Sequence, residues 1–486
     1  MSKIKFGTSG WRAVIAEDFT FENVRIAVQA IAEYLLKNRP ARKTPSVIVG
    51  GDTRFLSEKF AETATEILCG NGIKTYLANR DIPTPVISFE IIRRKLDGGI
   101  NFTASHNPYQ YQGLKFSPST GGPATPDITK TIEQLCDSPR LKIKSADLEI
   151  AAREKLLETI DPSQVYIRHI KSLVDIDAIK KSRVKAGVNL LYGTARGYLD
   201  TILTEECGIS ATVMCDERDV LFGKSGSPEP GKSNLGELVE TMKREKLDIG
   251  LAVDGDADRF GIIDEDGTFF TPNLIISLLM WHLIKTRSWK GFAVRSVMTT
   301  HLIDRIAEKF GARVVERPVG FKYIGEEMVK DGSVYPSKKG DFIIGGEESG
   351  GLTIRGHVPE KDGILACLLV LEAISYNKKP LKEILSGVMA ETGMNIYSDR
   401  LNFHLNEKQM DTIRTRLMKN PPKEIGGLKV KKLVTLDGYK FIFEDGVSWM
   451  GVRLSGTEPV ARLYVESDKE TKLKKLAAIG EEFLNT

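Results

Sequence analysis

Two observations predict an α/β protein with three related α/β domains in series and a C-terminal α+β domain. Short β-branched runs alternate with amphipathic helical stretches, as in SVIVGGDTR (46–54), SEKFAETATEILCGNG (57–72) and KTYLA (74–78). This order is typical of domains with parallel or mixed sheets. The chain also has 486 residues, whereas one hydrophobic core stops growing at about 250–300 residues.

The domain pattern changes near the C-terminus. The segment LDIGLAVDGDADRFGIIDEDG (247–267) predicts two strands around a polar turn, as expected inside an α/β domain. In contrast, MNIYSDRLNFHL (394–405) and the run at 430–455 predict strands, and KETKLKKLAAIGEEFL (469–484) predicts a closing helix. We therefore expect domains at 1–150, 160–268, 269–388 and 389–486.

Composition excludes several classes of partner. The net charge is only +4, which does not favour a nucleic acid or an acidic membrane surface as partner. No apolar run is long enough to cross a bilayer, and LIISLLMWHLI (274–284) predicts a buried helix. The N-terminal MSKIKFGTSGW lacks the apolar core of a signal peptide, and the five cysteines form no CxxC pair. These features predict reduced thiols and a cytoplasmic location.

The stretch NFTASHNPYQYQGLKFS (101–117) places Ser105 in a polar loop. His106 is adjacent, and adjacent side chains of an extended chain point in opposite directions. His106 is therefore a poor base for Ser105, and a role in shaping the loop fits it better. Asn107 and Pro108 predict a tight turn, and an ordinary surface turn is the alternative.

The segment DGDADR (254–259) contains three aspartates at i, i+2 and i+4. Asp254, Asp256 and Asp258 lie on one side of an extended segment, and apolar strands are predicted on both flanks. Three converging carboxylates repel one another unless a cation lies between them. Oxygen ligands alone suit a hard ion, so the pattern predicts a Mg²⁺ site.

Two further segments suggest ligand contacts. In GGEESGG (345–351), glycines flank Glu347 and Ser349, and carboxylates commonly hold a sugar through its hydroxyl groups. In RLSGTEPVARL (453–463), guanidinium groups, hydroxyl groups and a flexible glycine form a possible phosphate site. Its candidate residues are Arg453, Ser455, Gly456, Thr457 and Arg462.

A rival hypothesis comes from GSPEPGKS (226–233), which matches the Walker A pattern of P-loop nucleotidases. The P-loop binds phosphates through consecutive backbone N–H groups. Pro228 and Pro230 each remove one of these donors, and no strand is predicted to lead directly into Gly226. A nucleotidase therefore remains a remote alternative.

Together these elements indicate phosphoryl transfer on a sugar phosphate. A phosphatase would need one phosphate pocket, whereas a second anion site is predicted apart from the serine loop. Two sites suit a substrate with phosphates at both ends, and hence an intramolecular phosphate shift. A catalytically silent sugar-phosphate-binding protein is the other alternative.

The motifs TASHNP, DGDADR, GEESGG and RLSGTEP, with GTSGWR (7–12), resemble those of the α-D-phosphohexomutase family in the same order. The resemblance spans essentially the whole chain. It implies three related α/β domains with mixed sheets and a C-terminal α+β domain around a central cleft. It also implies Mg²⁺, small-molecule sugar phosphates as substrates, glucose 1,6-bisphosphate as activator, and a monomer or dimer.

The resemblance assigns a role to each matching residue. Ser105 would be the phosphoserine and would hold Mg²⁺ together with the three aspartates. Arg259 would lie near the phosphoryl group and Arg12 near the serine loop. Lys115 would be the general base, for which its pKa should be lowered by nearby cations. Glu347 and Ser349 would bind sugar hydroxyls, and the non-transferring phosphate would be bound by Arg453, Ser455, Gly456, Thr457 and Arg462.

The sugar loop departs from one pattern in the family. Many bacterial relatives of the broad mannose/glucose type or the glucosamine type have Ser-Gly-His where this chain has Ser-Gly-Gly (349–351). GHVPEKDG (356–363) and PVGFKYIG (318–325) resemble the glucose-type phosphoglucomutases instead. His357 and Lys361 are then candidates for acid–base catalysis and phosphate binding. We expect a phosphoglucomutase, with a phosphomannomutase or a dual-specificity enzyme as the alternative.

Overall fold

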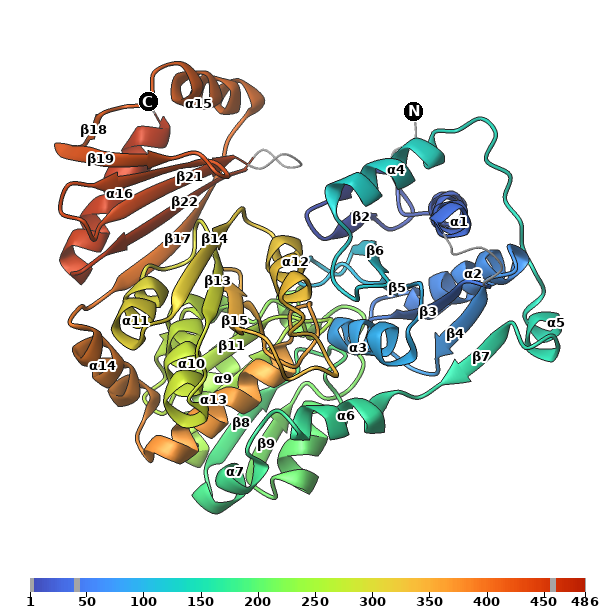
Figure 1. Cartoon of the computed structure of the whole chain (residues 1–486), viewed down its shortest axis with the longest axis horizontal. Helices are drawn as coiled ribbons and strands as arrows, with labels where there is room; N and C mark the ends of the chain where they lie inside the picture. The colour runs from blue at the N-terminus through green and yellow to red at the C-terminus, as the bar shows by residue number, and fades with distance from the viewer. Residues whose placement is uncertain (1–3, 39–43, 455–459, 486) are drawn as a thin grey trace.

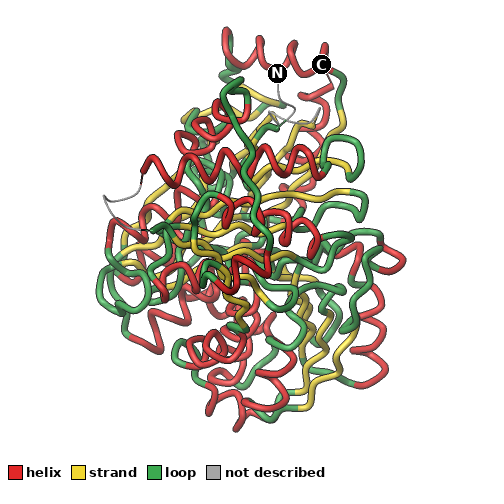
Figure 2. Tube along the Cα trace, turned by 90° about the vertical axis from the view of Figure 1, so that its right-hand side faces the viewer, coloured by secondary structure: helices red, strands yellow, loops and turns green. Residues whose placement is uncertain are grey.

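The computed structural model describes residues 4–38, 44–454 and 460–485 and contains four β-sheets that follow one another along the chain (Figure 1). The strands run through the interior, and most helices lie around them (Figure 2). Three of the sheets combine parallel and antiparallel strands, and the fourth is antiparallel throughout.

The first domain has a seven-stranded sheet in the order β1-β2-β6-β5-β3-β4-β7. Its strands are β1 (Phe6–Gly7), β2 (Gly10–Val14), β3 (Ser46–Gly51), β4 (Lys74–Ala78), β5 (Gly98–Phe102), β6 (Tyr111–Pro118) and β7 (Leu157–Ile160). Its helices are α1 (Phe21–Asn38), α2 (Ser57–Gly70), α3 (Thr84–Arg94), α4 (Pro126–Cys136) and α5 (Leu148–Arg153). Strand β6 runs antiparallel to β5, so the chain turns back on itself just after the serine loop.

The second domain has the sheet β12-β11-β10-β8-β9, in which β10 and β11 form the hairpin that carries the three aspartates. Its strands are β8 (Lys185–Asn189), β9 (Ser210–Met214), β10 (Ile249–Val253), β11 (Phe260–Asp264) and β12 (Phe269–Phe270). Its helices are α6 (Ser163–Lys171), α7 (Ile176–Ser182), α8 (Leu199–Thr201), a π-helical turn η1 (Ile202–Glu206), 3₁₀ turns η2 (Gly223–Ser225) and η3 (Lys232–Asn234), and α9 (Gly236–Glu245).

The third domain has the sheet β14-β13-β15-β16, and its last hairpin, β15 to β16, holds the predicted sugar loop. Its strands are β13 (Phe292–Ser296), β14 (Arg313–Arg317), β15 (Phe342–Glu347) and β16 (Gly351–Ile354). Its helices are α10 (Pro272–Arg287), α11 (Leu302–Phe310), α12 (Phe321–Asp331), α13 (Gly363–Asn377) and α14 (Leu381–Thr392).

The fourth domain has the antiparallel sheet β17-β22-β21-β20-β19-β18, with helices against its apolar face. Its strands are β17 (Tyr397–His404), β18 (Glu424–Ile425), β19 (Leu428–Val434), β20 (Tyr439–Phe443), β21 (Trp449–Leu454) and β22 (Val460–Ser467). Its helices are α15 (Glu407–Lys419) and α16 (Glu470–Asn485). The expected change to an α+β domain near the C-terminus is therefore confirmed.

The sheets extend past some of the boundaries expected from the sequence. Strand β7 (Leu157–Ile160) joins the first sheet, beyond the expected limit at 150. Strand β12 (Phe269–Phe270) joins the second sheet, and α14 continues to Thr392, past 388. Backbone pairing between distant segments decides these limits, and local composition does not reveal it.

The second and third domains share one hydrophobic core. Leu251 of β10, Ile344 of β15 and Leu368 of α13 are buried in the same cluster. Helix α13 packs against strands of both sheets, so the aspartate hairpin and the sugar-loop hairpin sit on a common support. Helix α10 contains the expected buried segment at 274–284, and no helix of the described ranges is long and apolar enough to span a membrane.

Candidate active site

Ser105 lies in the loop between β5 and β6 and is buried. Its φ of 53° is a left-handed conformation that residues other than glycine seldom adopt. The Ser105 backbone N–H donates to Thr103 Oγ1 (2.8 Å), and its hydroxyl donates to Asp254 Oδ2 (2.7 Å). The His106 Nδ1 atom is 3.4 Å from Ser105 Oγ, a poor hydrogen-bond distance. The serine loop thus points its hydroxyl at the aspartate hairpin of the second domain.

Arg54 supports this loop, a contact that sequence reasoning missed. Its guanidinium group is fully buried and donates to the backbone carbonyl oxygens of Ser105 (2.7 Å) and Asn107 (2.6 Å). It also donates to the carbonyl oxygens of Pro108 (2.9 Å) and Tyr111 (3.0 Å). The available signal was the charged sequence DTR that directly follows the apolar strand SVIVGG.

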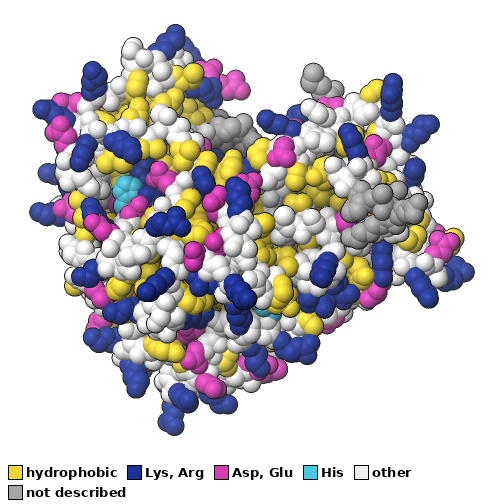
Figure 3. All heavy atoms as spheres, in the orientation of Figure 1, with side chains coloured by type: hydrophobic (Ala, Val, Ile, Leu, Met, Phe, Trp, Pro, Cys, Tyr) yellow, Lys and Arg dark blue, Asp and Glu magenta, His cyan; other side chains and the backbone are white. Residues whose placement is uncertain are grey.

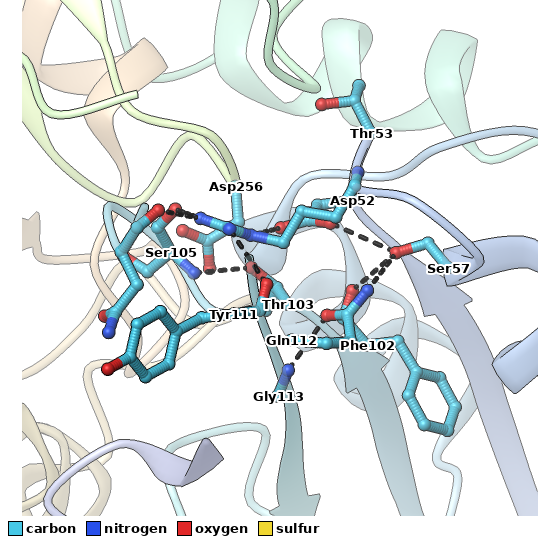
Figure 4. A network of polar contacts seen from close by, with 12 residues as sticks. Asp52, Thr53, Ser57, Phe102, Thr103, Ser105, Tyr111, Gln112, Gly113 and Asp256 are labelled. Atoms are coloured by element: carbon cyan, nitrogen blue, oxygen red, sulfur yellow. Dashed lines mark hydrogen bonds and ion pairs between the residues drawn. The ribbon is translucent and has the colours of Figure 1, made fainter. Parts of the chain in front are cut away.

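Asp52 holds the Arg54 side chain in place. Arg54 Nε donates to Asp52 Oδ2 (3.1 Å), and Ser57 Oγ donates to Asp52 Oδ1 (3.1 Å). Figure 4 shows this network between the end of β3, helix α2 and the serine loop. Burial raises the pKa of Asp52, while the Arg54 charge opposes the shift. The pair therefore fixes one orientation of the loop backbone.

Arg12 lies against the same loop, as expected. Its Nη1 donates to Asn107 Oδ1 (2.6 Å), so strand β2 contributes a cation beside Ser105. Burial lowers the pKa of Arg12, and the charge of Arg259 lowers it further. Two guanidinium groups therefore lie close to the serine loop, where an anionic phosphoryl group would be stabilised.

The three aspartates converge between β10 and β11. Asp254, Asp256 and Asp258 are buried, and one oxygen atom from each lies within 4.8 Å of the others. The backbone N–H groups of Asp258 and Arg259 both donate to Asp254 Oδ1 (2.9 Å each). Burial raises the pKa of Asp254, and the charge of Asp256 raises it further.

This donor set fits Mg²⁺. Asp256 Oδ1 and Asp258 Oδ1 are buried and have no hydrogen-bond partner among the described residues. A buried carboxylate oxygen without a partner costs free energy unless a cation or donor satisfies it. The all-oxygen set is one that Mg²⁺ prefers. The three aspartates therefore form a metal site.

Two lysines face the other oxygens of the aspartates. Lys115 Nζ of β6 lies 2.5 Å from Asp256 Oδ2 and 2.8 Å from Asp258 Oδ2. Lys361 Nζ lies 3.0 Å from Asp258 Oδ2. Lys361 reaches this point because the Gly363 backbone N–H, at the start of α13, donates to Ala257 O (2.9 Å).

The expected lowering of the Lys115 pKa is not found. Burial lowers the pKa of Lys115, but the carboxylates of Asp256 and Asp258 outweigh burial and raise it overall. The sequence suggested a lysine surrounded by cations, whereas its nearest charged neighbours in the structure are two carboxylates. Which charges face a side chain depends on the packing of separate domains.

The sugar loop lies beside the aspartate hairpin. The Phe260 backbone N–H donates to Gly350 O (3.2 Å) and ties the two loops together. Ser349 Oγ donates to Glu347 Oε1 (2.6 Å), while Glu347 Oε2 is buried without a hydrogen-bond partner among the described residues. Glu348 accepts from Ser296 (2.6 Å) instead and turns into the third domain. Ser349 and Glu348 line the neighbouring cavity, while Glu347 keeps one buried oxygen atom without a hydrogen bond in the described ranges.

The predicted phosphate site lies on the fourth domain. Arg453 of β21 pairs with Asp437 (Nε–Oδ1 3.1 Å), and Asp437 also accepts from the Val319 backbone N–H (3.0 Å). Arg462 of β22 is the cross-strand partner of Arg453. Ser455, Gly456 and Thr457 lie outside the described residues. In the space-filling view, the surface is hollowed between the first and fourth domains (Figure 3).

The structure corrects the catalytic role expected for His357. His357 is fully buried, with Nδ1 3.0 Å from His169 Nε2 and Nε2 2.8 Å from Asp362 Oδ2. Tyr166 also donates to Asp362 Oδ2. Both ring nitrogens are thus used in a network between the second and third domains. A ring committed in this way has no nitrogen free for acid–base catalysis on a substrate.

The Walker-like segment does not form a P-loop. The turn η3 begins inside this segment, at Lys232, and helix α9 begins only at Gly236. The Tyr109 backbone N–H donates to Gly226 O (2.9 Å), and Ser227 Oγ donates to His106 O (2.6 Å). This segment therefore braces the serine loop, without a strand and helix arranged to cradle a nucleotide phosphate.

Comparison with known proteins agrees with this geometry. The phosphoglucomutase/phosphomannomutase domain I profile matches residues 3–142, and the domain II, domain III and C-terminal domain profiles match 164–267, 271–392 and 407–480. A phosphoglucomutase of Komagataeibacter xylinus is 30% identical over 96% of this chain and 88% of its own. A probable phosphoglucosamine mutase of Methanosphaera stadtmanae is 29% identical over 99% of this chain and 98% of its own.

Among solved structures, a putative phosphomannomutase of Thermus thermophilus superimposes with a TM-score of 0.84 at 33% identity, and the match covers 100% of both chains. The names of these relatives differ in the sugar, while all describe mutases of sugar phosphates. The chain belongs to the phosphoglucomutase/phosphomannomutase family, the α-D-phosphohexomutases, and is an intramolecular phosphotransferase.

Proposed function

We propose that this chain interconverts α-D-glucose 1-phosphate and glucose 6-phosphate through a phosphoserine at Ser105 and a glucose 1,6-bisphosphate intermediate. The observation that carries the choice of sugar is the packing of Lys361 over Gly351. A Cβ atom at Gly351 would lie 2.0 Å from Lys361 Cδ. Family members of the broad mannose/glucose type or the glucosamine type commonly have histidine here, and this chain has no room for it while Lys361 contacts Asp258.

The chemistry starts from the phosphorylated Ser105. A free sugar hydroxyl attacks the phosphorus atom, and the bond between phosphorus and Ser105 Oγ breaks. The hydroxyl proton passes to Lys115, which must first lose the proton that Asp256 and Asp258 stabilise on it. The bisphosphate then turns so that its other phosphoryl group lies at Ser105. Transfer of this group to Ser105 Oγ restores the phosphoserine. Mg²⁺ would be held by Asp254, Asp256 and Asp258 together with the phosphoserine, where it would neutralise charge on the transferring group.

The remaining contacts bind and orient the substrate. Glu347 and Ser349 accept or donate hydrogen bonds to sugar hydroxyls, and the unpartnered Glu347 Oε2 supports this role. Arg12 and Arg259 stabilise the phosphoryl group near Ser105. The non-transferring phosphate is bound by Arg453, Ser455, Gly456, Thr457 and Arg462.

Phosphorus NMR tests the proposal. Enzyme and Mg²⁺ are mixed with α-D-glucose 1-phosphate and a trace of glucose 1,6-bisphosphate, and parallel samples contain mannose 1-phosphate or glucosamine 1-phosphate. We expect a glucose 6-phosphate signal without inorganic phosphate, faster than either parallel reaction. The S105A variant should give no product, although it should still bind the substrate.

Each other outcome contradicts a definite part of the proposal. Release of inorganic phosphate would indicate a hydrolase. Faster turnover of mannose or glucosamine phosphate would overturn the choice of glucose and leave the phosphoserine mechanism. Turnover by S105A would overturn the assignment of Ser105.

A further inference from the structure

One face of the fourth-domain sheet carries arginines from three neighbouring strands. Arg453 of β21 pairs with Arg462 of β22, and Arg400 of β17 pairs with Tyr464 of β22. Cross-strand partners lie on the same face of a sheet, as do residues two apart on one strand. Arg400 therefore shares a face with Arg453 and Arg462. The opposite face is the apolar one, with Leu463 and other side chains in the domain core.

Arg400 faces the site of the other domains across a cavity. The cavity has a volume of about 170 Å³, and its lining includes Arg400, Arg259 of the aspartate hairpin and Ser349 of the sugar loop. Helix α10 begins at the same cavity, where Asn273 donates to Ser398 Oγ (3.0 Å). Arg400 thus adds a positive charge from the fourth domain to the cavity that the sugar loop and Arg259 also line.

The Arg400 side chain is exposed to solvent and forms no ion pair within the described ranges. Arg453 is paired with Asp437, but no carboxylate of the described residues forms an ion pair with the guanidinium group of Arg400. The neighbouring Asp399 accepts the Arg400 backbone N–H instead (2.8 Å). Glu348, also in the lining, is already hydrogen-bonded to Ser296 and Thr299. The part of the lining that comes from the second and third domains contains one further acidic residue, Glu229.

Arg259, which lines the same cavity as Arg400, directly follows the three aspartates in the chain. An unpaired guanidinium group in such a place suits a phosphoryl group, to which it can donate two parallel hydrogen bonds.

We propose that Arg400 and Arg259 form an anion subsite in this cavity that binds a phosphoryl group of the sugar bisphosphate while the intermediate turns. The inference rests on the proposed function, because only a mutase needs its bisphosphate to exchange ends. During the turn, each phosphate leaves its terminal site. A subsite between the two keeps the intermediate bound when the terminal contacts are broken.

The test compares R400Q and R400K with the control R414Q. Arg414 lies on the exposed surface of α15 in the same domain and pairs with Asp411, so R414Q removes the same charge away from the cavity. The first readout is the glucose 1,6-bisphosphate concentration that gives half-maximal mutase activity. We expect it to rise about tenfold or more in R400Q, in line with the loss of a charged hydrogen bond. The rise should be smaller in R400K and absent in R414Q.

A binding measurement separates this inference from the proposed function. Isothermal calorimetry measures the binding of glucose 1,6-bisphosphate and, in parallel, of mannose 1,6-bisphosphate. The proteins compared are S105A, S105A/R400Q and S105A/R414Q, and the measurement requires no turnover. Weaker binding in S105A/R400Q alone supports the subsite whichever sugar the enzyme uses. Equal affinities in all three, or equal losses in the two double variants, would overturn it. Unchanged thermal midpoints confirm that the variants are folded, and wild-type turnover tests the proposed function by itself.

Discussion

Arg54 Nη2 donates a 2.7 Å hydrogen bond to the backbone carbonyl oxygen of Ser105, the residue we propose as the phosphoryl carrier. The two residues lie 51 positions apart in the chain. The contact explains how a left-handed conformation at Ser105 persists, because several fixed hydrogen bonds around the loop outweigh the cost of one strained residue. It also makes Arg54 a positioning residue that touches no substrate.

We therefore expect R54K to lower kcat by about 100-fold with a much smaller change in KM, since a displacement of about 1 Å at a reacting atom has that effect. Lysine keeps the charge but cannot supply the planar fork that reaches four carbonyl groups. Steady-state kinetics and a thermal melt measure both effects. The control R244K changes an exposed arginine of α9. A fully active R54K would show that the loop holds its shape without this residue.

Mg²⁺ should stabilise the folded chain because Asp256 and Asp258 carry buried oxygen atoms without hydrogen-bond partners among the described residues. A metal present at 100 times its Kd adds about 2.7 kcal/mol to the free energy of unfolding. We expect the thermal midpoint to rise on adding Mg²⁺ to EDTA-treated protein and not to rise in D258N. The variant D266N, in an exposed turn, is the control. An equal response of D258N and wild type would place the metal elsewhere.

Gly351 should not tolerate a side chain. A Cβ atom there would collide with Lys361 at 2.0 Å, so G351A should displace Lys361 from Asp258 and lower kcat/KM by about tenfold or more. In contrast, a Cβ atom at Gly387 of α14 would meet no other atom within 4 Å. G387A should retain full activity and gain up to about 1 kcal/mol in stability. Wild-type kinetics in G351A would remove the packing argument for glucose.

The buried Lys440 side chain should make the stability of the protein depend on pH. This buried lysine donates to Val297 O (2.6 Å) and contacts His301 Nε2 (2.9 Å) where the third and fourth domains meet. Burial, and next the charge of Arg295, lower its pKa from 10.5 to about 7. Between these two values the unfolded chain binds one more proton than the folded chain. Stability should therefore rise as the pH increases from 7 toward 10.5.

The measurement is urea unfolding at pH 7.0, 7.5, 8.0 and 8.5 for wild type and K440M. We expect the free energy of unfolding of wild type to increase relative to that of K440M across the series. The comparison at each pH cancels the contributions of groups that do not interact with Lys440, such as the cysteine thiols. A constant difference between the two proteins would mean that Lys440 stays charged in the folded state.

Local features of the chain determined much of the fold and the candidate metal site. Asp254, Asp256 and Asp258 converge because a short turn between two strands brings alternate side chains together, and all of its residues are adjacent in the sequence. The change to an α+β C-terminal domain was also visible in local strand patterns. Periodicity and spacing carry such information because they act over a few residues.

Only the tertiary structure decided which side chains meet across domains. Lys361 contacts Asp258, Arg54 holds the Ser105 loop, and Arg400 faces Arg259 across a cavity. His357, a catalytic candidate from its motif, is instead buried against His169 of another domain. Each of these contacts joins segments of the chain that are far apart in the sequence. Their distances and charges depend on how the sheets pack, and packing is set by the summed burial of whole domains, which no short motif contains.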